Sequence, residues 1–282
     1  MTVTHLSLSV NNLNDVQLYA DAVEQSQLEQ PLPFVEILWD NYCHLEPEKI
    51  LEYLSQFSDR VALHIMWSRF LERDQEEFEA FLNHLQHHVN IIQPVYISDH
   101  LCQFSLNNVA LYKGIELDYL NMDLELVRDR VQQYQESIGR QLLLENFASE
   151  DSKGKEQVEF IAELIAETNC GLLFDISNAI VAEKNNILSM SEWFPLFAYL
   201  DSLHCHVGSY SYHEKESCYY DTHDSNLSRE TLDDIKTIST SFHINTLCYE
   251  REHHRTSADM ANDMNQLFQQ YVMPKVSCLS NA

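Results

Sequence analysis

The sequence is poor in basic residues. Its 282 residues include 17 Lys and Arg against 44 Asp and Glu, which gives a formal net charge of −27. Such a charge repels phosphate backbones and anionic lipid surfaces, so we expect neither nucleic acid nor a membrane as a partner. The same negative field attracts metal cations, although a solvated acidic surface alone would give the same count.

Glycine is scarce, and paired cysteines and long apolar runs are missing. With 5 glycines and no GxGxxG or GxxxxGK pattern, the chain has no recognisable dinucleotide or nucleoside triphosphate loop. The 7 cysteines are odd in number and form no CxxC pair, so neither a disulfide framework nor an iron–sulfur cluster is expected. No run approaches membrane-spanning length, and the opening MTVTHLSLSV lacks a signal-peptide pattern. We therefore expect a cytoplasmic protein.

Eight short runs rich in apolar and β-branched residues predict strands. They cover residues 5–10, 34–39, 61–66, 94–97, 141–144, 171–176, 203–207 and 246–249. Segments with helical periodicity lie between them, among them 46–57, 74–89, 124–138, 156–168 and 229–239. Near-continuous hydrophobicity is typical of parallel strands covered on both faces. Eight strand–helix units predict an α/β fold, a closed (β/α)₈ TIM barrel over residues 1–260, with a C-terminal helix and tail over residues 261–282.

Six consecutive predicted strands end on residues that can bind metals. These residues are His64, Asp99, His100, Glu145, Asp175, His206 and Glu250. A single His after an apolar run is more often a hydrogen-bonded core or surface residue than a ligand. In a barrel, however, these strand ends converge on one mouth, where barrel enzymes carry their chemistry. Because buried carboxylates without a cation or base are costly, the joint placement favours a metal centre.

Further candidate ligands lie close to these strand ends. Asn178 follows Asp175 in FDISN, and Asp221 and His223 occur as YDTHD in a long polar loop over residues 208–224. A turn-forming Asp beside an incidental His is the default interpretation of the second motif. Nitrogen and oxygen ligands suit iron, manganese or zinc better than copper(I). So many ligands, for metals that each take about four to six, imply two or three ions with a bridging carboxylate, for which Glu145 is best placed.

Other His and Cys residues are predicted to lie outside the centre. Cys205 alternates to the opposite side of its strand from the ligand candidates and is expected to be a packing residue. Five histidines in a predicted helix or after the last strand are expected to be solvated. They are His84, His87, His88, His253 and His254.

Eight segments in order resemble one known family, the multinuclear non-haem iron-dependent oxidative enzymes that modify ribosomally made peptides. The segments are VEILWDNYCHLEP, LHIMWSRFLERD, VYISDHL, LLLENFAS, LLFDISNAI, HCHVGSYS, DTHD and CYERE. The family is a TIM barrel related to endonuclease IV and xylose isomerase, which agrees with the barrel predicted from the strand pattern. The sequence departs from the family at Tyr210, where members often carry a histidine.

The resemblance implies three iron sites. It assigns His64, His100 and Glu145 to a first iron. It assigns Glu145, Asp175, His206 and Glu250 to a second, and Asn178, Asp221 and His223 to a third, labile ion. Two or three ions with a mixed-valent Fe(II)/Fe(III) pair are implied.

The resemblance also implies a reaction and partners. The reaction is an O₂-dependent four-electron oxidation of cysteines in a precursor peptide, which gives an oxazolone next to a thioamide, a pair that later binds copper. The predicted catalytic residues are Glu145 and Asp99, the latter as an outer-shell orienter or proton acceptor. A small partner protein that recognises the precursor leader is expected to form a heterodimer with the chain.

Three alternatives compete with this interpretation. A zinc-dependent, endonuclease IV-like phosphodiesterase would use similar ligands, but it needs basic tracks that this chain lacks. A sugar isomerase with two divalent cations is disfavoured by the absence of a paired catalytic Lys near the strand ends. A non-enzymatic metal-binding scaffold would use the same residues for storage or stability.

Overall fold

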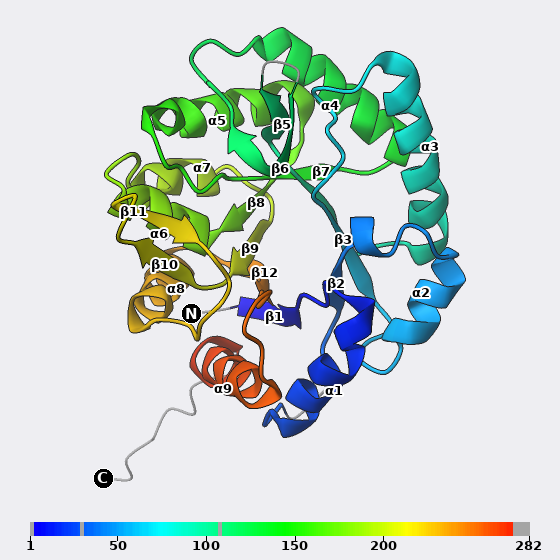
Figure 1. Ribbon diagram of the computed structural model, residues 1–282, viewed down its shortest axis with the longest axis vertical. Coiled ribbons are helices and arrows are strands. Elements are labelled where there is room, and N and C mark those ends of the chain that lie inside the picture. Colours follow the sequence, from blue (N-terminus) through cyan, green and yellow to red (C-terminus); the bar gives the residue numbers. More distant parts are fainter. Residues whose placement is uncertain (1–2, 29–30, 107–108, 273–282) are drawn as a thin grey trace.

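Eight parallel strands form the centre of the molecule in a computed structural model that describes residues 3–28, 31–106 and 109–272. The strands are β1 (Val3–Leu8), β2 (Val35–Leu38), β3 (Val61–Ile65), β4 (Ile97–His100), β7 (Leu142–Glu145), β8 (Gly171–Asp175), β9 (Leu203–Val207) and β12 (Ile244–Tyr249). They are paired in the order β1-β12-β9-β8-β7-β4-β3-β2, and a parallel bridge between Ser9 and Glu36 joins the two ends. Helices surround this ring (Figure 1). The predicted (β/α)₈ barrel is confirmed.

Local signals at the helix ends explain where the helices begin and end. The helices are α1 (Val16–Gln25), α2 (Pro47–Leu54), α3 (Gln75–Ile92), α4 (Leu124–Ile138), α5 (Gln157–Thr168), α6 (Ile176–Lys184), α7 (Phe194–Phe197), α8 (Arg229–Ser241) and α9 (Ser257–Leu267). Helix α4 spans the predicted residues because the Asp123 side chain caps its first turn and Gly139, with φ 65°, ends it in the left-handed conformation. Short helical turns η1 (Leu13–Asp15), η2 (Trp39–Asn41), η3 (Ser152–Glu156), η4 (Met190–Trp193) and η5 (Phe268–Val272) complete the connections.

Strand β4 differs from its prediction. The apolar pattern places it at 94–97, whereas the parallel ladder with β3 and β7 covers Ile97–His100. Pairing with two neighbours satisfies the backbone of the polar residues Ser98, Asp99 and His100, so their polarity does not end the strand. Side chains alternate along it, with His100 on the barrel interior and Asp99 facing the outer helices.

Two antiparallel hairpins extend from the strand ends. Strand β5 (Cys102–Leu106) pairs with β6 (Val109–Glu116), and β10 (Tyr210–His213) pairs with β11 (Cys218–Asp221). The strand pattern predicts neither hairpin, and the second lies in the long polar loop expected over residues 208–224. Much of both hairpins is solvent-exposed, so they lack the continuous hydrophobicity by which the barrel strands were found.

The last helix closes the outer ring. Helix α9 packs against α1 (Figure 1), and its Met260 and Met264 are buried. The predicted boundary between residues 260 and 261 therefore falls within α9, which forms part of the barrel. The part of the predicted C-terminal helix and tail that follows residue 272 lies outside the described residues. Within the described ranges, no helix combines the length and apolarity needed to cross a membrane.

The barrel interior is layered. Phe34, Ala62, Tyr96, Leu143 and Leu173 form a small apolar cluster of their own. The next inward-facing residues toward the carboxyl ends are polar, which places the ligand candidates above an apolar floor. The outward-facing Cys205 is fully buried in the main core, as its predicted packing role requires.

One of the histidines outside the centre is not solvated. His88 is 1% exposed, and its two ring nitrogens lie 3.1 Å from the carbonyl oxygens of His84 and Leu45. The prediction for this residue is wrong because α3 turns it toward η2, where it also packs against Trp39.

Candidate metal centre

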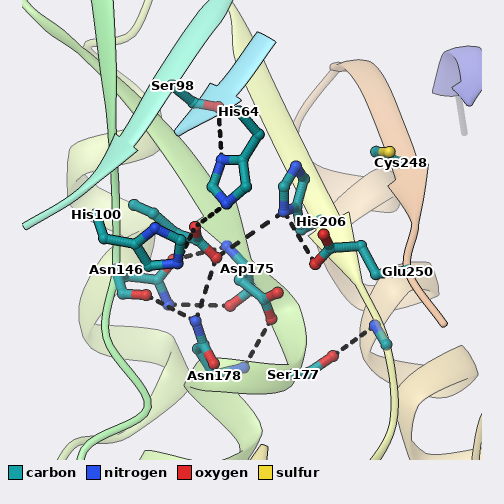
Figure 2. A network of polar contacts seen from close by, with 12 residues as sticks. His64, Ser98, His100, Asn146, Asp175, Ser177, Asn178, His206, Cys248 and Glu250 are labelled. Atoms are coloured by element: carbon teal, nitrogen blue, oxygen red, sulfur yellow. Dashed lines mark hydrogen bonds and ion pairs between the residues drawn. The ribbon is translucent and has the colours of Figure 1, made fainter. Parts of the chain in front are cut away.

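Six ligand candidates come together at the carboxyl ends of the barrel strands. His64, His100, Glu145, Asp175 and His206 lie in β3, β4, β7, β8 and β9, and Glu250 directly follows β12. Figure 2 shows the labelled members of this set converging on one space. All are buried except His100, which is partly exposed.

Two histidines face one oxygen of Glu145. The Nε2 atoms of His64 and His100 lie 3.4 and 3.2 Å from Glu145 Oε2. Their Nδ1 atoms have protein partners, Ser98 Oγ at 2.9 Å and the Ile65 carbonyl at 3.1 Å. Because a carbonyl only accepts, His100 Nδ1 donates, and its Nε2 lone pair faces Glu145. These are the three residues that the resemblance assigns to a first iron, and their ligand atoms lie close enough together to hold one ion.

A second group shares the other oxygen of Glu145. His206 Nδ1 lies 3.9 Å from Glu145 Oε1 and 3.1 Å from Glu250 Oε2. Asp175 caps α6, since its Oδ1 accepts the Asn178 backbone N–H at 2.7 Å. Glu145, Asp175 and His206 have ligand atoms close enough together to hold one ion. Glu145 thus belongs to both groups, as a bridging carboxylate must.

The third predicted group is only partly assembled. His223 Nε2 lies 2.9 Å from Asp221 Oδ1, and His223 groups with Asp175 and Glu250 as possible ligands of one ion. The Asn178 side-chain amide instead donates to Glu145 Oε1 at 3.3 Å and to the Asn146 carbonyl at 2.9 Å. The geometry therefore gives His223 a different set of neighbours from the one predicted.

Gly208 allows His223 to approach the barrel. A Cβ atom at Gly208 would lie 2.3 Å from His223 Cδ2, far inside van der Waals contact. Its backbone N–H donates to Ser177 Oγ at 2.7 Å, which fixes the strand end beneath the imidazole ring. His223 itself has a φ of 47°. The absence of a side chain at Gly208 thus allows His223 to lie beside Asp175 and Glu250, the third ligand group that the structure forms.

The donor atoms of the centre fit a cation. Five buried side-chain atoms there have no hydrogen-bond partner within the described part of the chain. They are Glu145 Oε2, Asp175 Oδ2, His206 Nδ1, Asp221 Oδ1 and His223 Nε2. Buried polar atoms without hydrogen bonds are rare and costly, and the neighbours of these atoms are other ligand candidates, such as Asp221 Oδ1 and His223 Nε2 at 2.9 Å from each other. Metal ions coordinated by them would remove that cost.

Burial and neighbouring charges shift the pKa values of the ligand candidates. Burial raises the pKa of Glu145 well above its ordinary value, and burial with the nearby Asp221 raises the pKa of Asp175 to about 7. Burial alone would lower the pKa of His206, yet the carboxylates of Glu250 and Glu36 raise it well above its ordinary value. For Glu250, burial is outweighed by His206 and His223, which lower its pKa. Protons and metal ions would therefore compete for these ligand atoms, as they do at most carboxylate and imidazole sites.

Asp99 is not brought to the ligand cluster. Its carboxylate is fully buried on the outer side of β4, where Oδ2 accepts from Tyr134 Oη at 3.0 Å and Oδ1 from the His100 backbone N–H at 2.7 Å. Its assignment as an outer-shell orienter or proton acceptor stays a prediction. Tyr210, where the sequence departs from the family, also points away, because its hydroxyl donates to Glu230 Oε2 at 2.7 Å.

Sequence reasoning missed Glu36. This residue in β2 is fully buried, and its Oε2 lies 2.9 Å from His206 Nε2. Together with Cys248 it forms a fourth group of potential ligands around His206. A carboxylate in the middle of the apolar run FVEIL was the available signal, since a buried charge requires partners.

A cavity of about 230 Å³ opens above the centre. His64, His100, Glu145, Asn178, Asp221, His223 and Glu250 line its floor and sides. The two hairpins meet across its mouth, where Lys113 of β6 lies 5.4 Å from the ring centroid of Tyr220 of β11 and 3.1 Å from Glu150 Oε1. The unpredicted hairpins therefore shape the access to the ligand cluster.

The eight parallel strands and the helices around them define the class of the molecule, a (β/α)₈ TIM barrel with its ligand groups at the carboxyl ends of the strands. A xylose isomerase-like TIM barrel protein from Mycobacterium smegmatis, in complex with magnesium, matches with a TM-score of 0.62 and 15% identity over 95% of this chain and 98% of that one. D-allulose 3-epimerase from Methylomonas sp. matches with a TM-score of 0.59 and 11% identity over 96% and 98% of the two chains. At these identities the likeness shows the fold alone.

Residues 16–270 match the family model described as RiPP precursor modification enzyme MbnB/TglH/ChrH, so the chain belongs to this family of enzymes that modify ribosomally made peptides. A UPF0276 protein of Psychromonas ingrahamii is 27% identical over 73% of this chain and 74% of its own length. A UPF0276 protein of Acaryochloris marina is 30% identical over 68% and 70%. The resemblance to a peptide-modifying family is confirmed.

Proposed function

We propose that the chain is an iron- and O₂-dependent oxidase that converts cysteine residues of a precursor peptide to oxazolone and thioamide groups, the activity expected of the methanobactin biosynthesis protein MbnB. The observation that carries the proposal is the sharing of Glu145. One of its oxygens faces His64 and His100, and the other faces His206. Two ions bridged by one carboxylate suit a reaction that must move several electrons.

Two sets of side chains, which share Glu145, would hold these ions. His64 and His100 would hold one iron with Glu145, and Asp175, His206 and Glu250 would hold the second with the same carboxylate. Bound iron would supply a position for the substrate thiolate and electrons for O₂. In the overall reaction four electrons and four protons leave the peptide and reduce one O₂ to two waters.

The cavity limits what enters the site. Its volume of about 230 Å³ is below the range of roughly 300–1,000 Å³ that encloses a whole drug-sized ligand. A cysteine side chain with its adjoining peptide groups would fit, while the rest of the precursor would lie across the hairpins. Leu38, Met66 and Phe147 supply apolar wall that would exclude water from the reacting cysteine.

A small cavity requires that the leader of the precursor be held elsewhere. We therefore propose a heterodimer with a small MbnC-like partner protein that presents an MbnA-like precursor to the cavity. Co-expression and size-exclusion chromatography test this part. A partner from the same gene neighbourhood should co-elute with the chain, and its omission should abolish modification of the full precursor.

The charge of the cavity disfavours the rival phosphodiesterase. Carboxylates of Glu145, Glu150, Asp221, Glu250 and Glu252 line it. Lys113, the lysine among the lining residues, is already paired with Glu150. A phosphodiester would meet repulsion from several sides unless metal ions neutralised all of these groups.

The decisive experiment combines metal analysis with turnover. Protein purified without oxygen should contain iron that gives a Mössbauer signal. On exposure to O₂ with a Cys-containing precursor from its gene neighbourhood, it should consume O₂ and leave a peptide lighter by four hydrogens. Tyr210→Phe, outside the cluster, is the matched control and should react like the wild type. Zinc alone, with neither O₂ uptake nor a mass change, would contradict the proposed oxidase.

A further inference from the structure

His206 differs from the other two histidines of the centre in the nitrogen that it directs inward. His64 and His100 direct Nε2 toward Glu145, whereas His206 directs Nδ1 toward Glu250 and Glu145. Its Nε2 points the other way, 2.9 Å from Glu36 Oε2. Of these three imidazoles, His206 is the one whose second nitrogen faces a carboxylate.

Glu36 has protein donors around both oxygens. Its Oε2 accepts from Tyr96 Oη at 2.7 Å, and its Oε1 accepts from Ser9 Oγ at 3.3 Å and from Cys248 Sγ at 3.6 Å. Neither oxygen is among the buried atoms that lack a partner, in contrast to Glu145 Oε2 and Asp175 Oδ2. A cation between Glu36, His206 and Cys248 would have to displace these donors. The surroundings therefore favour an acceptor of hydrogen bonds at Glu36 over a metal ligand.

We propose that Glu36 is a positioning residue of the metal centre: it accepts the Nε2–H of His206 and so directs the Nδ1 lone pair at the cation shared with Glu145 and Glu250. The inference rests on the metal centre of the proposed function. A carboxylate on the second nitrogen of a metal-bound histidine fixes the tautomer and ring orientation and makes the ligand more basic. Tyr96, directly before β4, donates to that carboxylate at 2.7 Å and holds it in place. The hydroxyl of Ser9, directly after β1, lies 2.7 Å from Asn11 Oδ1 and 3.3 Å from Glu36 Oε1, so it donates mainly to Asn11.

Metal affinity tests the proposal. Glu36→Met keeps the length of the side chain but removes the acceptor, and it should weaken anaerobic Fe(II) binding by roughly 10- to 100-fold in a competition titration. Tyr210→Phe is the control, because it removes a hydroxyl that donates to Glu230 outside the centre and leaves Glu36 and His206 unchanged. Its Fe(II) affinity should equal that of the wild type. A purely structural role would lower the melting temperature of the metal-free Glu36→Met protein and leave its Fe(II) affinity unchanged, and that result would overturn the proposal.

A spectroscopic measurement covers the case in which Glu36→Met fails to fold. In the zinc-loaded wild type, ¹⁵N–¹H correlation spectra of the imidazoles should show His206 protonated at Nε2 and bound to metal through Nδ1. In Glu36→Gln the Nε2–H resonance should move upfield, because a neutral amide is a weaker acceptor than a carboxylate. A spectrum with metal at Nε2 and the proton at Nδ1 would refute the assignment.

Metal binding by the wild type separates the role of Glu36 from the existence of the metal centre. A wild type that binds neither Fe(II) nor zinc would remove the metal centre itself. A wild type that binds Fe(II), with Glu36→Met folded and binding it equally well, would remove only the role of Glu36.

Discussion

His206 and Glu250 face each other at the ends of the neighbouring strands β9 and β12, with His206 Nδ1 3.1 Å from Glu250 Oε2 and both side chains buried. A lone pair on Nδ1 and a carboxylate oxygen repel at that distance unless a proton or a cation lies between them. The same residues can therefore form an ion pair or share a metal. The pair can therefore stabilise the barrel as an ion pair and can also supply ligands to the metal centre.

Substitutions at His206 or at the shared carboxylate Glu145 should remove activity and leave the barrel folded. We expect His206→Ala and Glu145→Ala to abolish precursor modification and to reduce bound iron, because each ligand belongs to a shared group. Circular dichroism should show that the barrel is retained. A variant with wild-type turnover would exclude the altered residue from the site, and Tyr210→Phe again provides the control.

Glu116 is not a member of the ligand groups, and it should make the free energy of unfolding depend on pH. Burial raises its pKa to about 7, and its Oε2 is buried without a partner within the described residues. The folded state therefore holds a proton that the unfolded state releases near pH 4.5, so this stabilisation is complete below that pH and is lost as the pH rises through 7.

The measurement for Glu116 is urea unfolding between pH 5 and 8. The free energy of unfolding of the wild type should fall over this range by on the order of 2 kcal/mol more than that of Glu116→Gln. Gln keeps an oxygen for the hydrogen bonds from Ser149 and Gln157 and does not titrate. Parallel curves for the two proteins would show that Glu116 has an ordinary pKa.

The parts of the molecule predicted well from sequence are those with strong local signals. Helical periodicity predicts a helix over residues 124–138, and α4 has these bounds because Asp123 and Gly139 form its caps. The convergence of the strand-end residues could be predicted because parallel strands in a closed barrel bring their carboxyl ends together whatever the separation along the chain. Their division into two iron groups came from the family resemblance, and the metal that they bind stays a prediction.

The parts predicted poorly depend on contacts between distant segments. Strand β4 was displaced because its backbone pairing with β3 and β7 outweighs the polarity of Ser98 and His100. The orientation of the Asn178 amide toward Glu145 follows from the register of β7 with β8 and from the Asp175 cap. No pattern within FDISN encodes that orientation.

Gly208 offers a test of the third group alone. Gly208→Ala places a Cβ against the His223 ring, and it should displace that ring and destabilise the protein by about 1–3 kcal/mol. The metal content should fall by the ion that depends on His223, while the ions at His64 and His206 are kept. Gly139→Ala is the control, because its φ of 65° makes Ala costly there although nothing lies within 4 Å of the added atom. It should lower stability without any loss of metal, and equal metal loss in both variants would contradict the argument.

A substitution at Asp99 tests whether this residue takes part in proton transfer or only supports the scaffold. Its oxygens are taken by Tyr134 and by the backbone of His100, and it faces away from the cavity, so a direct part in the reaction would need a route through the ligand His100. Asp99→Asn keeps an oxygen for the His100 N–H and places an amide donor beside the Tyr134 hydroxyl, which can accept. Because burial raises the pKa of Asp99 well above its ordinary value, the loss of the titrating group should have little effect on turnover.

We expect the turnover rate and the bound iron of Asp99→Asn to match the wild type, with a change in unfolding free energy of about 1 kcal/mol. If turnover instead slowed by roughly two orders of magnitude or more while the iron content was retained, the loss would be the size expected of a general acid or base and would establish the catalytic assignment predicted from the sequence.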